Sequence, residues 1–442
     1  MKAKKLTAIF MAAAMTISMT ACGSTETPAA TEAPATDSTG TDTAAETTAA
    51  DGETTLTMWT IATESDAFHE PYLKAIADYE EAHPGVKIKM DTFENESYKT
   101  KIKSAVAANE LPDIFFTWAG GFSADFIATG EVLPLSDYYD AYKDQISEAA
   151  LANATYDGTL YGSVTNTPVS LMFYNKKIFD ANGLKVPETL DELKDVCGKL
   201  KAAGVTPIAT SVKDTWVFNM LGDGLTLKSA GPDATAKAIT RQGVTYGGED
   251  FLPAAQALVD LRDAGAFIDG ATGLSNDEAC QEFYQGNAAI YFTGSWMSGS
   301  IATDAPTPED FDCAPIPVIN PANAKLTDFM GGGSDTLMVS AATENKDLAA
   351  QAAFEITRDV SKYSFTSGAG IPAWKVDYDA DVSPMTQKIA DYCTNASSFT
   401  LWFDTLMTSE DAGVYLDLMQ QLYVGDITPE EFDDAMNTQL GN

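Results

Sequence analysis

The sequence predicts an α/β fold of two lobes. Its body, from Thr54 to Asn442, is longer than the size at which a single hydrophobic core stops growing, so two lobes are expected. Strand-like and helix-like segments alternate along this body, which favours mainly parallel sheets covered by helices. Tryptophans repeatedly follow the expected strands, at the edge where ligands collect in such sheets.

The first half of the body alternates strands and helices. Apolar and polar residues alternate over 86–91, which is typical of a half-buried strand, whereas apolar residues from Phe68 to Tyr79 recur at helical spacing. The expected elements are a strand at 56–60, a helix that ends at Pro84, a strand at 86–91, a helix at about 98–108 and a strand at 111–116.

The second half repeats this alternation. Residues 164–168 and the strand 171–174 are expected to carry the chain across a hinge. The further expected elements are a helix at 175–181, a helix at 188–203 with its leucines on one face, and strands at 207–210 and 288–292.

Six tryptophans lie at strand ends or in loops, where core packing explains them poorly. A pyranose has an apolar face and a rim of hydroxyls, so several flat aromatics suit it. Burial of one such face contributes about 1 to 2.5 kcal/mol, whereas micromolar binding needs about 8 kcal/mol. The pattern therefore favours a sugar site built from several of them: Trp59, Trp118, Trp216, Trp296, Trp374 and Trp402.

Carboxylates near the tryptophans are candidate acceptors for sugar hydroxyls, because two oxygens in one plane can accept two O–H groups. Glu64, Asp335 and Asp404 are the three candidates. With 64 acidic residues in the chain, a solvated surface charge is the simpler explanation for each one taken alone.

The N-terminus predicts export. Lysines precede an apolar run that ends at Ala21, so 1–21 is expected to be a signal peptide, too short for a membrane span. The boundary at Cys22 resembles a bacterial lipobox, with Met19 where leucine is usual, and implies diacylation of Cys22. The alternative is an ordinary signal peptide followed by a chance cysteine.

The segment 22–53 is expected to be a disordered tether. It is rich in Thr, Ala and acidic residues, and after Cys22 it has no aromatic residue, valine, leucine or isoleucine, so it cannot offset its ordering entropy by burial. Its reach is about 100 Å when extended and about 30 Å as a random coil.

The charge and the cysteines restrict the function classes. A formal net charge of −37 argues against nucleic acid and anionic lipid as partners; a solvated acidic surface is favoured over an acidic face that docks a basic membrane partner. The cysteines of the body could pair in three ways, but a large body needs no disulfide. They are Cys197, Cys280, Cys313 and Cys393.

The sequence offers little for catalysis. His69 and His83 are its two histidines, and the common hydrolase and metalloprotease motifs are absent. Asp377, Asp379 and Asp381 imitate a calcium loop, but Val382 occupies its glycine position. We therefore expect neither an enzyme nor a cofactor or metal. The rival interpretation is a secreted glycoside hydrolase with two carboxylates, which spacing cannot exclude.

Several motifs, in a fixed order over nearly the whole body, resemble the family 1 extracellular solute-binding proteins, the sugar-binding lipoproteins of bacterial ABC importers. They are Leu56-Thr57-Met58-Trp59, Pro112-Asp113-Ile114-Phe115, Phe173-Tyr174-Asn175-Lys176, Gly286-Asn287-Ala288-Ala289-Ile290, Gly294-Ser295-Trp296 and Gly370-Ile371-Pro372. The resemblance implies a periplasmic-binding-protein-like (type II) fold, with a hinge and a central ligand cleft. It implies one lobe from 54–167 and 316–360, and another from 168–315 and 361–442.

The resemblance also implies ligand contacts and partners. The implied ligand residues are Trp59, Glu64 and Trp118, then Trp216, Trp296 and Trp402, with Asp335 and Trp374 in more variable loops. The expected partners are a carbohydrate, with a slight preference for an oligosaccharide, and the transmembrane subunits of an ABC permease. A lipid-anchored monomer at the extracellular face of the cytoplasmic membrane is expected.

Overall fold

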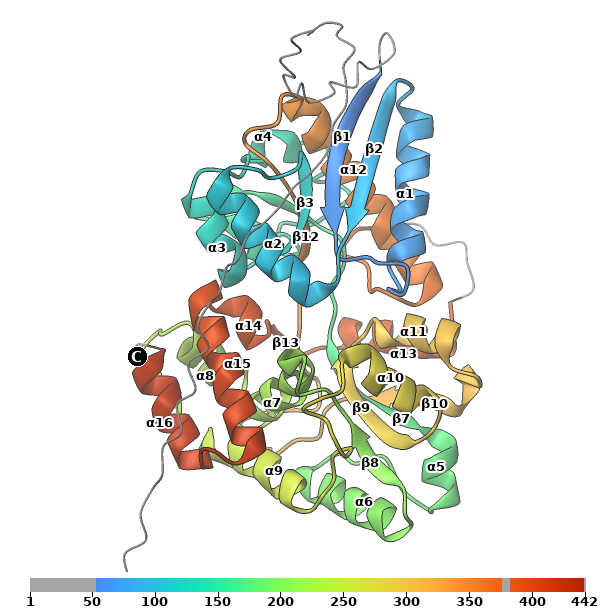
Figure 1. Ribbon diagram of the computed structural model, residues 1–442, viewed down its shortest axis with the longest axis vertical. Coiled ribbons are helices and arrows are strands. Elements are labelled where there is room, and N and C mark those ends of the chain that lie inside the picture. The colour runs from blue at the N-terminus through green and yellow to red at the C-terminus, as the bar shows by residue number, and fades with distance from the viewer. Residues whose placement is uncertain (1–52, 376–381, 441–442) are drawn as a thin grey trace, which may run out of the picture. The chain divides into compact units, whose positions relative to one another are not determined.

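The computed structural model describes residues 53–375 and 382–440, which belong to one compact unit (Figure 1). The expected signal peptide, Cys22 and nearly all of the tether lie outside the described residues, as do Asp377, Asp379 and Asp381. Within the described ranges, no helix combines the length and the apolar character needed to cross a bilayer.

The first sheet has five strands in the order β2-β1-β3-β12-β6. Strands β1, β2 and β3 are parallel, and β12 returns antiparallel between β3 and β6. The strands are β1 (Thr54–Thr60), β2 (Val86–Thr92), β3 (Ile114–Trp118), β6 (Gly162–Val164) and β12 (Asp335–Val339). The helices beside them are α1 (His69–Ala82), α2 (Asn95–Ala108), α3 (Gly121–Ala128), α4 (Ser136–Tyr139) and α12 (Lys346–Ser367). We call this sheet with its helices the first lobe.

The second sheet has four strands in the order β10-β7-β9-β8. They are β7 (Ser170–Asn175), β8 (Thr206–Ala209), β9 (Ala288–Gly294) and β10 (Phe311–Ala314). Its helices are α5 (Lys176–Ala181), α6 (Leu190–Ala202), α7 (Thr215–Ala230), α8 (Pro232–Ile239), α9 (Leu252–Asp263), α10 (Asn276–Tyr284), α11 (Met297–Asp304), α13 (Pro384–Thr394), α14 (Phe403–Leu406), α15 (Ser409–Val424) and α16 (Pro429–Gln439). Two short strands, β11 (Asp328–Met330) and β13 (Ser398–Thr400), pair separately. We call this part the second lobe.

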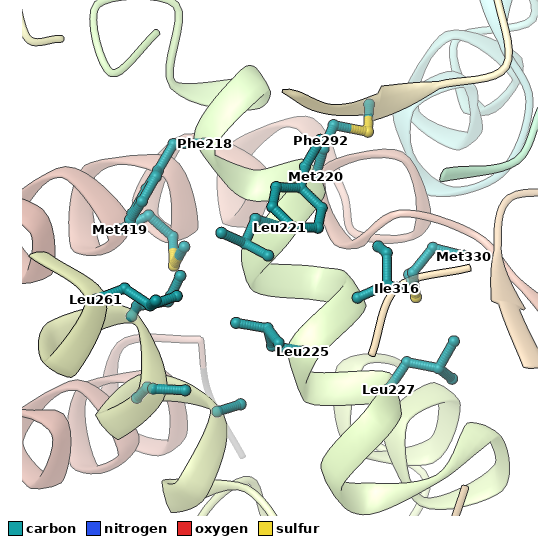
Figure 2. Close-up of a cluster of buried hydrophobic side chains, with 14 of the residues drawn as sticks. Phe218, Met220, Leu221, Leu225, Leu227, Leu261, Phe292, Ile316, Met330 and Met419 are labelled. Atoms are coloured by element: carbon teal, nitrogen blue, oxygen red, sulfur yellow. The ribbon is translucent and has the colours of Figure 1, made fainter. Parts of the chain in front are cut away.

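Helix α7 is the centre of the second core (Figure 2). It is buried all round from Val217 to Ala230, as its apolar residues on every face require. Phe218 and Leu221 pack among side chains from β9 and from the helices α9 and α15. Because α7 begins at Thr215, its first turn carries Trp216 toward the cavity described below.

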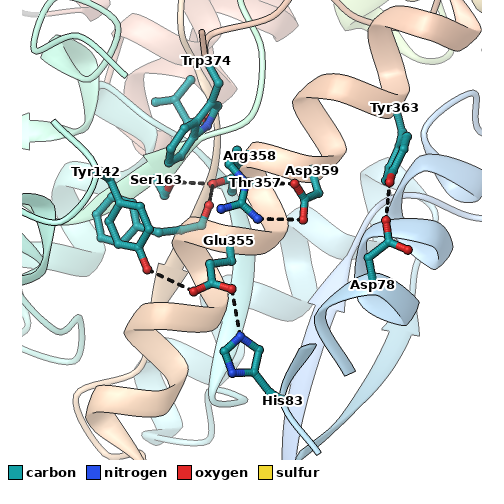
Figure 3. A network of polar contacts seen from close by, with 12 residues as sticks. Asp78, His83, Tyr142, Ser163, Glu355, Thr357, Arg358, Asp359, Tyr363 and Trp374 are labelled. Atoms are coloured by element: carbon teal, nitrogen blue, oxygen red, sulfur yellow. Dashed lines mark hydrogen bonds and ion pairs between the residues drawn. The ribbon is translucent and has the colours of Figure 1, made fainter. Parts of the chain in front are cut away.

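A polar network fixes α12 in the first lobe (Figure 3). Nε2 of His83, at the end of α1, lies 2.9 Å from Oε2 of Glu355, and the hydroxyl of Tyr142 donates to Oε1 of the same carboxylate at 3.4 Å. Two residues further along α12, the Thr357 hydroxyl pairs with that of Ser163 on β6. These contacts hold α12 against the first sheet, although α12 lies far from β1 in the sequence.

Three segments cross between the lobes side by side. A bridge joins Val169 to Gly331, and another joins Asn166 to Pro372. A Cβ on Gly331 would lie 2.1 Å from the Pro168 carbonyl oxygen, and its φ of 135° suits glycine. Glycine at 331 thus allows two crossing segments to approach closely.

The expected elements of both sheets are present, with shifted ends. The third strand begins at Ile114 and not at 111, because Pro112 has no N–H and the Asp113 carboxylate turns back to Thr57, accepting from its N–H and its hydroxyl at 2.8 Å each.

The packing differs from the expected lobe boundaries at two places. Ile316 and Met330 lie in the second core, although 316–360 was assigned to the first lobe, and Trp374 lies in the first core. We propose lobe boundaries at the crossing segments near 166, 332 and 370 instead. The four described cysteines are free, and Cys197, Cys280 and Cys313 are buried.

Candidate functional site

A cavity of about 700 Å³ is lined by residues of both lobes. The first lobe contributes Trp118 and Asp335, and the second contributes Trp216, Trp296 and Trp402. Asp404 lines the cavity too, so six of the nine predicted site residues meet at one place.

Three tryptophans of the second lobe form a row with Trp296 in the middle. The ring centroid of Trp296 is 6.2 Å from that of Trp216 and 6.1 Å from that of Trp402. Trp296 follows β9, and a Cβ on Gly294 would lie 2.0 Å from its ring. The ring therefore folds back over the strand end, which only a glycine at 294 permits.

Trp402 and Asp404 are held in place by buried polar groups. The indole Nε1 of Trp402 donates to the Ser170 hydroxyl at 2.7 Å. The next residue, Phe403, donates its backbone N–H to the carboxylate of Asp223 at 2.9 Å, and the hydroxyl of Tyr415 donates to the same carboxylate. Asp223 is fully buried on α7, so it links the core to the segment that carries two cavity residues.

In the first lobe, strand pairing sets Trp118 beside Asp335. They are directly opposite in the antiparallel register of β3 and β12. The Trp118 ring packs edge-on against Phe116 at 5.1 Å and Phe122 at 5.2 Å, which leaves it half-buried at the cavity. Gly121 lies so close in space to the segment before α15 that a Cβ on it would be 2.2 Å from the Met407 carbonyl oxygen.

The carboxylates of the cavity are poorly solvated. Burial raises the pKa of Asp335 to about 7, and the negative charge of Asp66 adds to the increase. Burial likewise raises the pKa of Asp66 to about 6, with a further contribution from Asp277. The pKa of Asp404 is also raised, chiefly by burial. Such carboxylates gain most from a ligand that donates O–H groups to them.

Three predicted residues lie away from the cavity. Trp59 points to the face of β1 covered by α2, with its ring against Phe93 at 5.6 Å and Lys101 Nζ 3.9 Å from its centroid. Trp374 is 3% exposed in the first core and donates its Nε1 to the Val164 carbonyl at 2.8 Å. Glu64 is exposed to solvent. For these three the expected placement disagrees with the structure.

Several lining residues were not predicted. Asp66 replaces Glu64 in the same loop, because its carboxylate accepts from the N–H of Phe68 at 2.8 Å and is turned inward. Tyr72 follows on the first turns of α1, and Asn276 begins α10. The helical spacing of Phe68 and Tyr72 indicates a helix and gives no sign of a cavity, and nothing local distinguishes Asn276 from other residues at the start of a helix.

The arrangement suits a ligand with flat apolar faces and many O–H donors. Aromatic faces come from both lobes, and carboxylate and amide oxygens lie among them. Among the described residues, no group of three or more His, Cys, Asp or Glu side chains is placed to hold a metal ion.

Comparison with known proteins identifies the family of this chain. The family model for the bacterial extracellular solute-binding proteins matches residues 62–355. An uncharacterized ABC transporter extracellular-binding protein from Pyrococcus horikoshii is 24% identical over 392 residues, which are 87% of this chain and 88% of the relative.

Solved structures extend the likeness to the described body. A structure from a study of xylan utilization by the thermophilic bacterium Caldanaerobius polysaccharolyticus is similar with a TM-score of 0.84 at 36% identity, over 88% of this chain and 100% of that one. A chitin oligosaccharide binding protein is similar with a TM-score of 0.79 at 26% identity, over 87% of this chain and 97% of that one.

Proposed function

We propose that this chain, which belongs to the bacterial extracellular solute-binding proteins, captures a carbohydrate between its lobes and delivers it to the permease of an ABC importer. The observation that carries the proposal is the cavity in which three tryptophans of one lobe and Trp118 of the other lie among carboxylates. In this proposal the solute is bound and delivered without chemical change.

Several aromatic faces are needed on energetic grounds. Covering one pyranose face contributes about 1 to 2.5 kcal/mol, so one tryptophan is insufficient for micromolar binding at about 8 kcal/mol. Four tryptophans with Asp335, Asp404 and Asn276 as hydroxyl partners supply enough contacts. The cavity volume of about 700 Å³ is in the range of sites that enclose ligands larger than a single sugar ring. We therefore favour an oligosaccharide, in line with the xylan study and the chitin oligosaccharide binding protein.

The N-terminus supports a lipid anchor as part of this function. Cys22, after an apolar run and a basic start, is proposed to be diacylated, and 23–53 to tether a monomeric body to the extracellular face of the membrane. Mass spectrometry of the membrane fraction should find a lipidated N-terminal Cys22, and Cys22→Ala should release the protein to the medium. A mature N-terminal Cys22 without lipid in that fraction would contradict the anchor.

Intrinsic tryptophan fluorescence tests the function. A soluble form that begins near Asp51 is titrated with xylo-oligosaccharides, chito-oligosaccharides and their monosaccharides, while chromatography checks that each sugar stays intact. We expect a saturable change with intact oligosaccharide. Shortened sugar would instead support a glycoside hydrolase, and no response across the panel would favour a solute of another class.

A further inference from the structure

Above about pH 7, where Asp335 and Asp66 are ionised, the wall of the cavity carries a large excess of negative charge. Eight carboxylates and two lysines line it. The acids come from both lobes: Asp66, Glu94, Glu96 and Asp335 from the first, and Asp214, Asp277, Asp304 and Asp404 from the second. Charge of one sign therefore surrounds a ligand on both sides.

The two lysines do not offset this excess. Nζ of Lys99 already lies 2.8 Å from the carboxylate of Glu96, and Lys213 is exposed to solvent. Among the described residues that line the cavity there is no arginine, whose planar fork is the usual partner of a ligand carboxylate or phosphate. An anionic ligand would thus enter without a free cationic partner.

The carboxylates also act on one another across the cavity. Beside burial, Glu96 and Glu94 of the first lobe raise the pKa of Asp214 in the second. Asp277 of the second lobe does the same for Asp66 of the first. Like charges therefore lie on both sides of the space where the tryptophans would hold a sugar ring.

From this wall we propose that the cavity selects saccharides by charge: it accepts neutral ones and excludes those that carry a carboxylate, sulfate or phosphate group. The inference rests on the proposed function and adds the ligand's charge class to it. A like charge brought among several carboxylates in a partly desolvated site is repelled at every contact, and a neutral sugar avoids this cost while still donating hydroxyl hydrogens.

Three matched probes separate charge from size. They are xylotetraose, xylotetraose with one 4-O-methylglucuronic acid branch, and the methyl ester of that branch, which is neutral and slightly larger than the acid. Calorimetry at low salt should give an affinity for the acid at least about tenfold below that for the ester. If chito-oligosaccharides are the tighter ligands in the fluorescence panel, triacetylchitotriose and its 6-O-sulfate replace the xylotetraose probes.

Equal affinity for the acid and the ester, or for triacetylchitotriose and its sulfate, would overturn the inference. Failure of every neutral sugar to bind would overturn the proposed function itself.

Two changes test whether the wall is the cause. The double variant Asp277→Asn with Asp304→Asn removes two charges from exposed sites at the cavity. The ratio of the affinity for the ester to the affinity for the acid should then fall toward one. The matched control, Asp144→Asn with Glu148→Gln, removes two exposed charges elsewhere and should leave the ratio unchanged. Raising the salt concentration should also reduce the ratio, since screening weakens repulsion but not a steric clash. A ratio insensitive to both changes would contradict the electrostatic cause.

Discussion

The four tryptophans that line the cavity can be tested against one that does not. Trp118→Ala and Trp296→Ala should each weaken oligosaccharide binding about tenfold or more, because each removes an apolar face of the site. Trp59→Ala is the control, since the Trp59 ring packs on Phe93 outside the cavity. The affinity of this variant for the oligosaccharide should change less than twofold. Calorimetry measures all three, with thermal unfolding to confirm that each folds. Comparable losses in all three variants would contradict the assignment.

A glycine that makes no ligand contact should matter nearly as much as a tryptophan. In Gly294→Ala the new methyl group would overlap the ring of Trp296, so that ring must leave its place in the row. We expect a loss of affinity similar to that of Trp296→Ala. Gly198→Ala on α6 is the control, because nothing lies within 4 Å of its Cβ position. Full affinity in Gly294→Ala would mean that the position of the Trp296 ring is unimportant.

At the scale of elements, α7 connects the second core to the cavity through Asp223. In Asp223→Leu the N–H of Phe403 loses its acceptor, which costs about 1 to 3 kcal/mol for a buried amide and loosens the segment of Trp402 and Asp404. Both the melting temperature and the ligand affinity should fall. Asp223→Asn keeps an acceptor oxygen and should recover most of the affinity. An equal loss in Asn and Leu variants, measured by calorimetry well below both melting temperatures, would argue against this positioning role.

The elements could be predicted from the sequence because their signals are local. The alternation over 86–91 and the helical spacing from Phe68 to Tyr79 predict a strand and a helix without knowledge of the rest of the chain. The close contact of Gly121 with the Met407 carbonyl joins segments far apart in sequence, and no local pattern indicates it.

The site could be predicted only in part for the same reason. Trp59 and Trp118 both end strands, but the Trp59 ring packs between Phe93 and Lys101, whereas Trp118 pairs with Asp335 at the cavity. Which face a strand end presents depends on the helices packed on it. Likewise, a chain with 64 acids gives no local reason to prefer Asp66 over Glu64.

At the scale of the whole molecule, the two lobes supply complementary halves of one site. A ligand that touches Trp118 and Asp335 on one side and Trp296 on the other gains all of its contacts only when both lobes surround it. Such a ligand shifts the population toward that state, since binding favours the conformation in which its contacts are complete. The binding free energy is therefore shared between contacts and the lobe equilibrium.

The acidic cavity also makes the stability of the protein depend on pH. Asp335, with a pKa of about 7, and Asp66, with a pKa of about 6, hold protons more tightly in the folded chain than at the ordinary value of 3.8. Between about pH 4 and pH 7 the folded state therefore binds more protons than the unfolded state, so the contribution of these groups to the free energy of unfolding falls as the pH rises.

Replacing the carboxylate of Asp335 should remove part of that dependence. In urea unfolding, Asp335→Asn should gain stability relative to the natural chain as the pH rises from 4.5 to 7.5, because only the natural chain must then hold a poorly solvated charge at 335 beside Asp66. Asp144→Asn, at an exposed site outside the cavity, is the matched control and should show a constant difference. The comparison is made at each pH, so the titration of the other acids cancels. A constant difference for Asp335→Asn as well would mean that its carboxylate is solvated, and that the negative wall of the cavity costs the folded protein nothing.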